Sequence, residues 1–173
     1  MNFPYPLLEK EVIIQDIKPL PQLKWYFFFY EWKALITLIV VAEIVWWIVE
    51  KTPLPFGWFP LGIGALLSVP LAYFIAKCRY KWQHYWITNQ RVIEQQGLIG
   101  YKIKAVPFKR ISDIILTRSW LEKLLGFGSL HIQTLAGQIS AGVGGAEISM
   151  LALPQPEETQ QLLFRLIKSK LSV

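Results

Sequence analysis

An uninterrupted apolar stretch near the middle of the chain restricts its fold more than any other feature. Residues Phe56–Ala76 carry no charged side chain over 21 positions, FGWFPLGIGALLSVPLAYFIA. As a helix rising 1.5 Å per residue, the segment is about 31 Å long, close to the roughly 30 Å hydrocarbon thickness of a bilayer. Prolines and glycines such as those it contains are tolerated in membrane helices. The stretch therefore predicts a transmembrane helix.

An earlier segment, residues 27–49, predicts a second span. Its centre, Ala34–Ala42, is uncharged, and aromatic clusters lie on both sides of that centre, as is typical of the two membrane–water interfaces. The segment also carries three charged residues, Glu31, Lys33 and Glu43. The alternative is a buried helix of a soluble domain. Residues 50–55 are too few to do more than link two adjacent antiparallel elements, which favours a transmembrane hairpin.

The distribution of Lys and Arg predicts the orientation of this hairpin. Four lysines lie in the leading segment, one lies in the connecting loop, and Lys77, Arg79 and Lys81 follow the second span immediately. Basic residues favour the cytoplasmic side, so both ends of the chain are expected there, in a multi-pass protein of an inner (cytoplasmic) membrane or an equivalent internal membrane. From Lys77 onward there are 13 basic and 6 acidic residues, a net charge of +7. Membrane lipids are therefore the expected partner of this charge, and no nucleic-acid partner is expected.

After the second span the pattern changes to short strands that alternate or are rich in β-branched residues. Strands are expected at YWIT, RVIEQQG and YKIKAVPF, within Ile111–Ser119, and at Leu130–Leu135 and Ala146–Leu153. Ser119 and Glu122 form a capping box for a short helix, Trp120–Leu125, which Gly126 ends. The glycine-rich residues 135–146 are expected to form a hairpin loop. An amphipathic helix that begins at Pro156 completes a small barrel or sandwich.

The order and spacing of four segments resemble the membrane-anchored subtype of the bacterial pleckstrin-homology-like (PH-like) domain family. They are YWITNQRVIEQQG, VPFKRISDI, RSWLEKLLGFGSLHIQT and ISMLALPQPEETQQLLFRLI. The resemblance covers about Tyr80–Lys170. It implies a strongly bent antiparallel sheet or barrel capped by the C-terminal helix, and it implies no reaction.

The expected fold class is accordingly a membrane-anchored α+β protein with three regions. These are a cytoplasmic N-terminal segment (residues 1–26), a two-helix transmembrane hairpin (27–76) and a PH-like domain (80–173). Eukaryotic PH domains bind phosphoinositides through a long loop between their first two strands. Here that connection is only Thr88–Arg91, a tight turn, so we expect no phosphoinositide pocket.

Catalytic and metal-binding patterns are absent from the sequence. His84 and His131 have no Cys, His or acidic partner at metal-ligand spacing, and Gly142–Gly145 lacks the Gly-Lys-Ser/Thr ending of a phosphate loop. We therefore expect no enzyme activity, no cofactor and no metal.

Two groups of residues remain as candidate sites. The first is a basic patch facing lipid or a protein partner, formed by Arg91, Lys102, Lys104, Lys109 and Arg110; ordinary solvated strand faces are the alternative. The second is Glu43, the acidic residue at membrane depth, which either contacts a partner or reaches outward to the membrane surface.

Three functions follow from these candidates. The chain is a non-catalytic module that docks a membrane-protein partner or complex, as an accessory subunit or assembly factor; or a module that senses anionic lipid; or a small transport component that uses Glu43. The sequence gives no oligomeric state.

Overall fold

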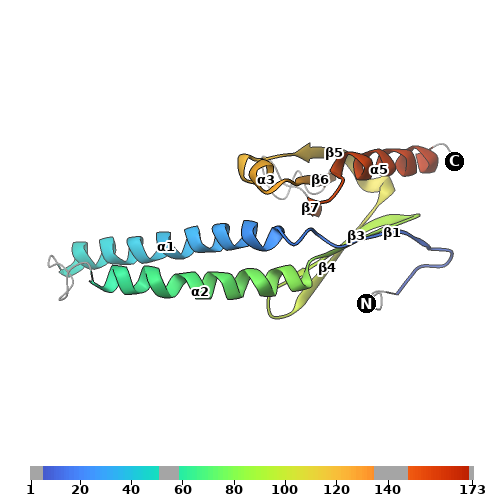
Figure 1. The fold of residues 1–173 in the computed structure, drawn as a ribbon. Coiled ribbons are helices and arrows are strands. Elements are labelled where there is room, and N and C mark those ends of the chain that lie inside the picture. The colour runs from blue at the N-terminus through green and yellow to red at the C-terminus, as the bar shows by residue number, and fades with distance from the viewer. Residues whose placement is uncertain (1–5, 51–58, 135–147, 172–173) are drawn as a thin grey trace. The chain divides into compact units, whose positions relative to one another are not determined.

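The computed structural model describes residues 6–50, 59–134 and 148–171 and divides into two compact units. Unit 1 combines Met1–Gln22 with Trp82–Val173, and unit 2 is Leu23–Lys81. Figure 1 shows the chain starting in unit 1, running through the two long helices of unit 2 and returning to unit 1.

Unit 2 consists of two antiparallel helices, α1 (Leu23–Glu50) and α2 (Phe59–Trp82, whose last residue is assigned to unit 1). Lys24 Nζ lies 4.7 Å from the centre of the Tyr80 ring, and a Cβ on Gly64 would lie 3.4 Å from Ile39. The small residues Ala72 and Ala76 are fully buried, so the helices pack closely. Large apolar side chains elsewhere on both helices are exposed, for example Leu38, Trp47, Leu66 and Phe74.

One helix of the described residues, Gly62–Trp82 within α2, has the length and apolar composition needed to cross a membrane. α1, which carries Glu31, Lys33 and Glu43, does not meet that criterion. The predicted apolar character of the second span is thus found, whereas composition alone does not establish the first. The predicted connecting loop lies mostly in residues 51–58, outside the described residues.

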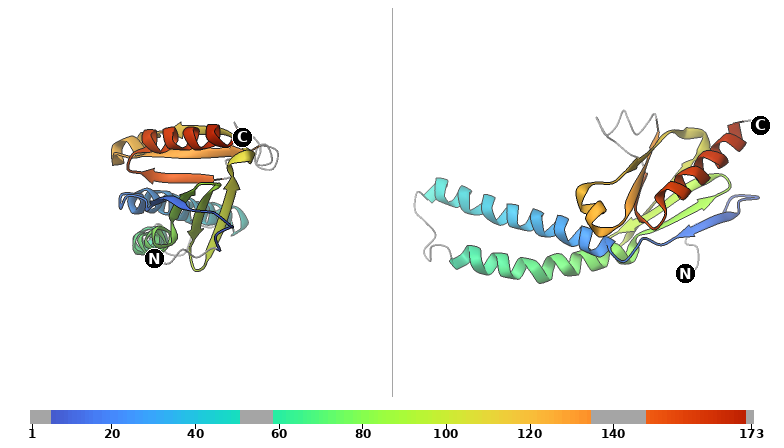
Figure 2. Two further views of the ribbon diagram at one scale, coloured as in Figure 1. Left: turned by 90° about the vertical axis from the view of Figure 1, so that its right-hand side faces the viewer. Right: turned by 45° about the horizontal axis from the view of Figure 1, so that its top comes forward.

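Unit 1 contains two antiparallel sheets that form two layers (Figure 2). Sheet A has the order β1 (Ile13–Ile17), β2 (His84–Thr88), β3 (Arg91–Gly97) and β4 (Tyr101–Pro107). Sheet B has the order β5 (Ile111–Thr117), β6 (Gly128–Thr134) and β7 (Ile148–Leu153). The other elements are the short 3₁₀ helix η1 (Phe108–Arg110), α3 (Trp120–Leu125) and α5 (Pro156–Leu171).

The local signals of the sequence are confirmed in unit 1. Ser119 Oγ accepts a hydrogen bond from the Glu122 N–H, the Glu122 carboxylate accepts one from the Ser119 N–H, and Gly126 adopts the left-handed conformation that ends α3. The expected strands from His84 to Leu153 and the final helix are all present. The glycine-rich segment expected to be a loop falls among residues 135–147, which lie outside the described residues.

The core of unit 1 lies between the sheets and under α5, which crosses β5 and β6 (Figure 2). Fully buried side chains come from both sheets and from α5; they include Ile87, Val92, Leu130, Ile132, Met150 and Leu163. Two antiparallel sheets closed by a C-terminal helix confirm the PH-like α+β fold.

The sequence analysis did not anticipate β1. Residues Ile13–Ile17 pair antiparallel with β2, Ile17 opposite Tyr85, and thus form the edge of sheet A. The N-terminal segment is therefore part of the PH-like unit, and the whole of α1 and α2 is inserted between two hydrogen-bonded strands. The turn Thr88–Arg91, predicted to be the first connection of the domain, joins its second and third strands. The first two strands of the domain are instead connected through α1 and α2, so the prediction that a tight turn joins them is wrong.

Candidate interaction site

The strand registers give unit 1 two distinct ends. At one end, β1 finishes and β2 starts; we call it the helix end, because the chain leaves there for α1 and returns there from α2. The turn between β3 and β4, with Gly97 opposite Tyr101, lies at this end too, since the start of β2, His84, pairs with Gln95. We call the opposite end the turn end, which carries the Thr88–Arg91 turn.

The predicted basic patch is divided between these two ends. Lys102 is exposed near the helix end, whereas Lys109 and Arg110 are exposed in η1 at the turn end. Along β4, Lys102 lies five residues from Pro107, which pairs with Arg91; that separation is about 17 Å at 3.4 Å per residue. The five residues therefore do not form one continuous surface.

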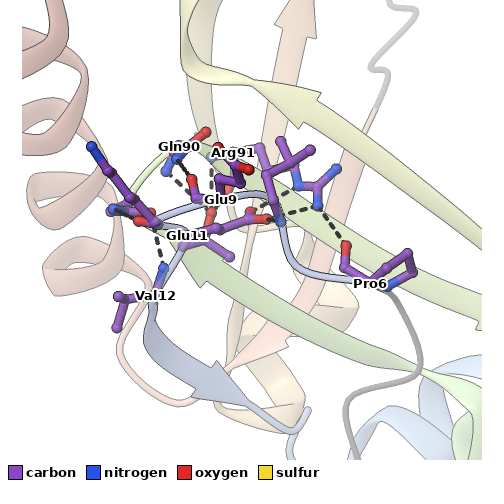
Figure 3. A network of polar contacts seen from close by, with 10 residues as sticks. Pro6, Glu9, Glu11, Val12, Gln90 and Arg91 are labelled. Atoms are coloured by element: carbon purple, nitrogen blue, oxygen red, sulfur yellow. Dashed lines mark hydrogen bonds and ion pairs between the residues drawn. The ribbon is translucent and has the colours of Figure 1, made fainter.

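Arg91 lies in the interior, not on a lipid-facing surface, and this corrects its place in the patch. Its Nε and Nη2 atoms donate to the two carboxylate oxygens of Glu11, both at 2.8 Å, and Nη2 also donates to the Pro6 carbonyl at 3.3 Å (Figure 3). The Glu11 side chain is completely buried and that of Arg91 is 9% exposed. A bidentate pair of this geometry is among the strongest hydrogen-bonded contacts in proteins.

The segment around Glu11, residues 6–12, wraps the Thr88–Arg91 turn, and we call it the strap. Asn89 donates through Nδ2 to the Lys10 carbonyl and accepts through Oδ1 from the Val12 N–H, at 2.9 and 3.1 Å. Gln90 Nε2 donates to the Glu9 carbonyl at 3.3 Å. Lys10 has a φ of 62°, the left-handed conformation needed for the bend. The strap thus anchors β1 to sheet A.

The electrostatics of Glu11 follow from this contact. Burial by itself raises the pKa of the carboxyl, but hydrogen bonds from Arg91, the Leu8 N–H and Thr88 outweigh burial, so the pKa lies below its usual value. Glu11 therefore remains ionised at neutral pH and holds the strap as a carboxylate.

Lys104 also faces inward, toward Glu94. Its Nζ lies 4.0 Å from Glu94 Oε2, an oxygen for which the described residues provide no hydrogen-bond partner. The other oxygen accepts from Gln83 Nε2 at 3.2 Å, and Gln83 also donates to the Tyr85 hydroxyl at 2.8 Å. Burial raises the pKa of Glu94, and Lys104 opposes that rise. Glu94 is thus an internal acid, 2% exposed, between sheets A and B.

A groove of about 400 Å³ runs between β1 and α5. Its lining is mixed polar and apolar: Ile14, Gln15, Glu158, Gln161, Leu162 and Arg165. Gln15 Oε1 is buried and accepts no hydrogen bond from the described part of the chain. Since β1 is the edge of sheet A, an extended segment could pair with it beside this groove, as strand-adding peptides do.

Both histidines make structural contacts between strands. His131 bridges sheet B, with Nδ1 3.1 Å from Ser149 Oγ and Nε2 3.0 Å from Thr117 Oγ1, and burial lowers its pKa. His84 pairs with Asp16 and stacks on Trp86. Across residues 6–50, 59–134 and 148–171, no cluster of His, Cys, Asp and Glu could hold a metal ion.

Glu43 lies on α1, partly buried in unit 2. No ion pair joins it to another described residue, whereas Glu31, one of the other acidic residues of α1, pairs with Arg79 of α2. Transport through Glu43 therefore stays a prediction from the sequence.

Sequence reasoning missed β1 and the Glu11–Arg91 pair. A signal for β1 was present, since Val12–Ile17 is rich in β-branched residues and is bounded by prolines within a few residues on each side. No local signal identifies the ion pair, because its partners are 80 residues apart.

Comparison with known protein families supports the fold. The sequence model of the bacterial PH domain family matches residues 34–167, most of the chain. The matched region starts after β1, within α1. No curated protein and no solved structure gives a match. PH-like domains generally are interaction modules without catalytic activity. The chain belongs to the bacterial PH domain family.

Proposed function

We propose that the protein is a non-catalytic PH-like interaction module, anchored by α1 and α2 in a membrane and docking a protein partner at the cytoplasmic face. The basic residues Lys77, Arg79 and Lys81 at the end of α2 support this orientation.

The observation that carries the proposal is the pairing of β1 with β2. β1 precedes α1, β2 follows α2, and the two strands are hydrogen-bonded neighbours in sheet A. If α2 alone crossed a bilayer, these strands would lie on opposite sides and could not pair. The chain therefore crosses either twice or not at all. The apolar composition of α2 and its exposed side chains favour two crossings.

The charges of α1 fit such an arrangement. The Glu31 carboxylate pairs with Arg79, which lies beyond the uncharged part of α2, so a basic residue from the membrane surface neutralises it. Ile39 lies against Gly64, which places Ala34–Ala42 at the level of the uncharged centre of α2. At 28 residues, α1 is about 42 Å long and can cross the hydrocarbon with turns to spare.

Labelling with a membrane-impermeant maleimide tests whether the segments before α1 and after α2 both lie on the cytoplasmic side. In a Cys78→Ser chain, we expect Lys18→Cys and Lys109→Cys to be protected in intact cells and to react in inside-out vesicles. Both residues are exposed and lie on opposite sides of unit 2 in the sequence. Reaction of one but not the other in intact cells would contradict the proposal.

The groove between β1 and α5 is the docking surface that we propose for the protein partner. It combines a strand edge, an exposed apolar side chain at Ile14 and the opposite charges of Glu158 and Arg165, features that suit an extended polypeptide.

Photo-crosslinking from α5 tests this surface. A photoreactive residue at Gln161, which lines the groove, should give a discrete crosslinked product in native membranes. The same residue at Lys168, exposed on α5 but outside the groove, is the matched control. Equal crosslinking at both positions, or none at Gln161, would rule out the groove as the docking surface.

A further inference from the structure

The helix end of unit 1 carries large apolar side chains that the core does not use. Ile99, at the tip between β3 and β4, is 94% exposed, and its neighbours Leu98 and Tyr101 are also exposed. On α3, Trp120 is 78% and Leu124 75% exposed, one helical turn apart on the same face. Exposed apolar side chains that lie together mark an interaction surface. A second group of them, Leu7, Leu8 and Val12, lies in the strap at the turn end.

The hairpin tip is built to present its apolar residues outward. Gly97 pairs with Tyr101, and a Cβ on Gly97 would lie 1.8 Å from the Gly100 carbonyl oxygen, so only glycine permits so tight a turn. The Tyr101 ring stacks on Trp82, with the ring centres 5.6 Å apart. Because Trp82 is the last residue of α2, this stacking ties the tip to the point where the chain returns from the helices.

α3 lies at the same end of the unit. It joins β5 to β6, where Gly128 pairs with Leu153. The adjoining residue Ala152 accepts a backbone hydrogen bond from Leu20, at 2.9 Å, three residues before α1 begins. Both apolar elements thus flank the points where the chain leaves unit 1 for α1 and re-enters it from α2.

The charges on these two elements are basic. Lys102 is exposed beside Tyr101, and Lys123 is exposed on α3 between Trp120 and Leu124. The acidic residue of α3, Glu122, is buried, where it completes the capping box and accepts a hydrogen bond from Ser129. Apolar and aromatic tips beside lysines, with the carboxylate turned inward, match the boundary between anionic headgroups and acyl chains.

We propose that the helix end is a lipid-binding surface: Leu98, Ile99, Trp120 and Leu124 enter the headgroup–acyl boundary of the membrane that α1 and α2 cross, while Lys102 and Lys123 contact lipid phosphates. This inference rests on the proposed anchoring. It assigns lipid contact to a surface different from the predicted basic patch, of which it keeps Lys102 alone.

Depth-dependent quenching in the full chain tests the inference. The Cys78→Ser protein, reconstituted in vesicles of equal parts phosphatidylcholine and phosphatidylglycerol, carries a single fluorophore at Ile99→Cys or Leu124→Cys. Lipids bear a nitroxide either near the headgroup or deep in the acyl chain. Lys109→Cys, exposed at the turn end, is the matched control, and Leu66→Cys, exposed on α2, reports on anchoring.

We expect the headgroup nitroxide to quench the probes at Ile99 and Leu124 about threefold or more over the probe at Lys109, and the deep nitroxide to quench the probe at Leu66. If Leu66 is quenched while Ile99 and Leu124 behave like Lys109, the helix-end surface is refuted and the anchoring stands. If Leu66 is not quenched, the anchoring fails and the inference fails with it.

Discussion

At the scale of single residues, the structure changes the role of charges that the sequence places on the surface. The sequence predicts Arg91 and Lys104 on a surface, yet one pairs with Glu11 and the other faces Glu94. The alternation of residues along a strand shows which side chains share a face, but it does not show which of the two faces another segment of the chain covers. In this protein the strap, which was not predicted from the sequence, covers Arg91.

Arg91→Ala is expected to destabilise unit 1 by about 3–5 kcal/mol, because it leaves the Glu11 carboxylate buried and uncompensated. Lys109→Ala, an exposed position in the adjoining η1 helix, is the control and should change stability by less than about 0.5 kcal/mol. Thermal unfolding of the detergent-solubilised chain, monitored by the protease sensitivity of unit 1, measures the stability of both variants. Equal stability of the two variants would show that the pair contributes little.

Two of the buried acids, Glu11 and Glu94, give opposite pH dependences. The pKa of Glu11 is lowered in the folded state, so its contribution is complete above its ordinary value of 4.5 and is lost as the pH falls through the lower folded value. The pKa of Glu94 is raised, so folding becomes less favourable as the pH rises from 4.5 toward its folded value.

Glu94→Gln is therefore expected to stabilise the protein at pH 7 by about 1 kcal/mol and to flatten the pH profile above 4.5. The amide retains the shape of the side chain, and Lys104 keeps access to water, with 30% of its side chain exposed. Glu11→Gln is the comparison, and should instead flatten the profile below 4.5. A Glu94→Gln protein whose melting curve keeps the wild-type slope between pH 5 and 8 would contradict this account.

At the scale of elements, prediction succeeded where the signal was local. The capping box fixed α3, and alternation with turn residues located β2 to β7, because each signal lies within the segment that it describes. β1 was missed because the segments that resemble the PH-like family start only at about Tyr80, and because its partner strand lies beyond both helices, Ile17 pairing with Tyr85. The groove against α5 could not be predicted either, since β1 forms one of its walls.

Removal of β1 is expected to abolish folding of unit 1. A chain of residues 80–173 leaves the edge of β2 unpaired and Arg91 without its carboxylate, so we expect it to aggregate. Residues 6–22 joined through a short Gly/Ser linker to residues 82–171 should instead be soluble and folded, because Ile17 and Tyr85 are already neighbours in an antiparallel pair. Dispersed amide resonances distinguish the two chains, and a well-folded 80–173 fragment would contradict the prediction.

At the scale of the whole molecule, the connection between the units restricts how the chain can enter a membrane. The PH-like unit closes only when residues before α1 meet residues after α2, so anchoring and folding depend on each other. That only one described helix is apolar enough to cross a membrane by itself is therefore compatible with two crossings. In the proposed topology, α2 supplies most of the preference for lipid, and strand pairing requires α1 to cross with it in spite of Glu31, Lys33 and Glu43.

This dependence predicts that charges introduced into α1 will unfold unit 1. Leu38→Arg with Val41→Arg places two arginines in the exposed apolar centre of α1, at about 2.5–3.5 kcal/mol each for insertion. Tyr30→Arg, exposed nearer the basic end of the helix, is the control and should be tolerated. We expect the double variant to leave unit 1 sensitive to protease in native membranes, because β1 is held away from β2, while the control stays resistant. If unit 1 remains protected in the double variant, α1 need not cross the bilayer for the sheet to close, and the two-crossing topology fails.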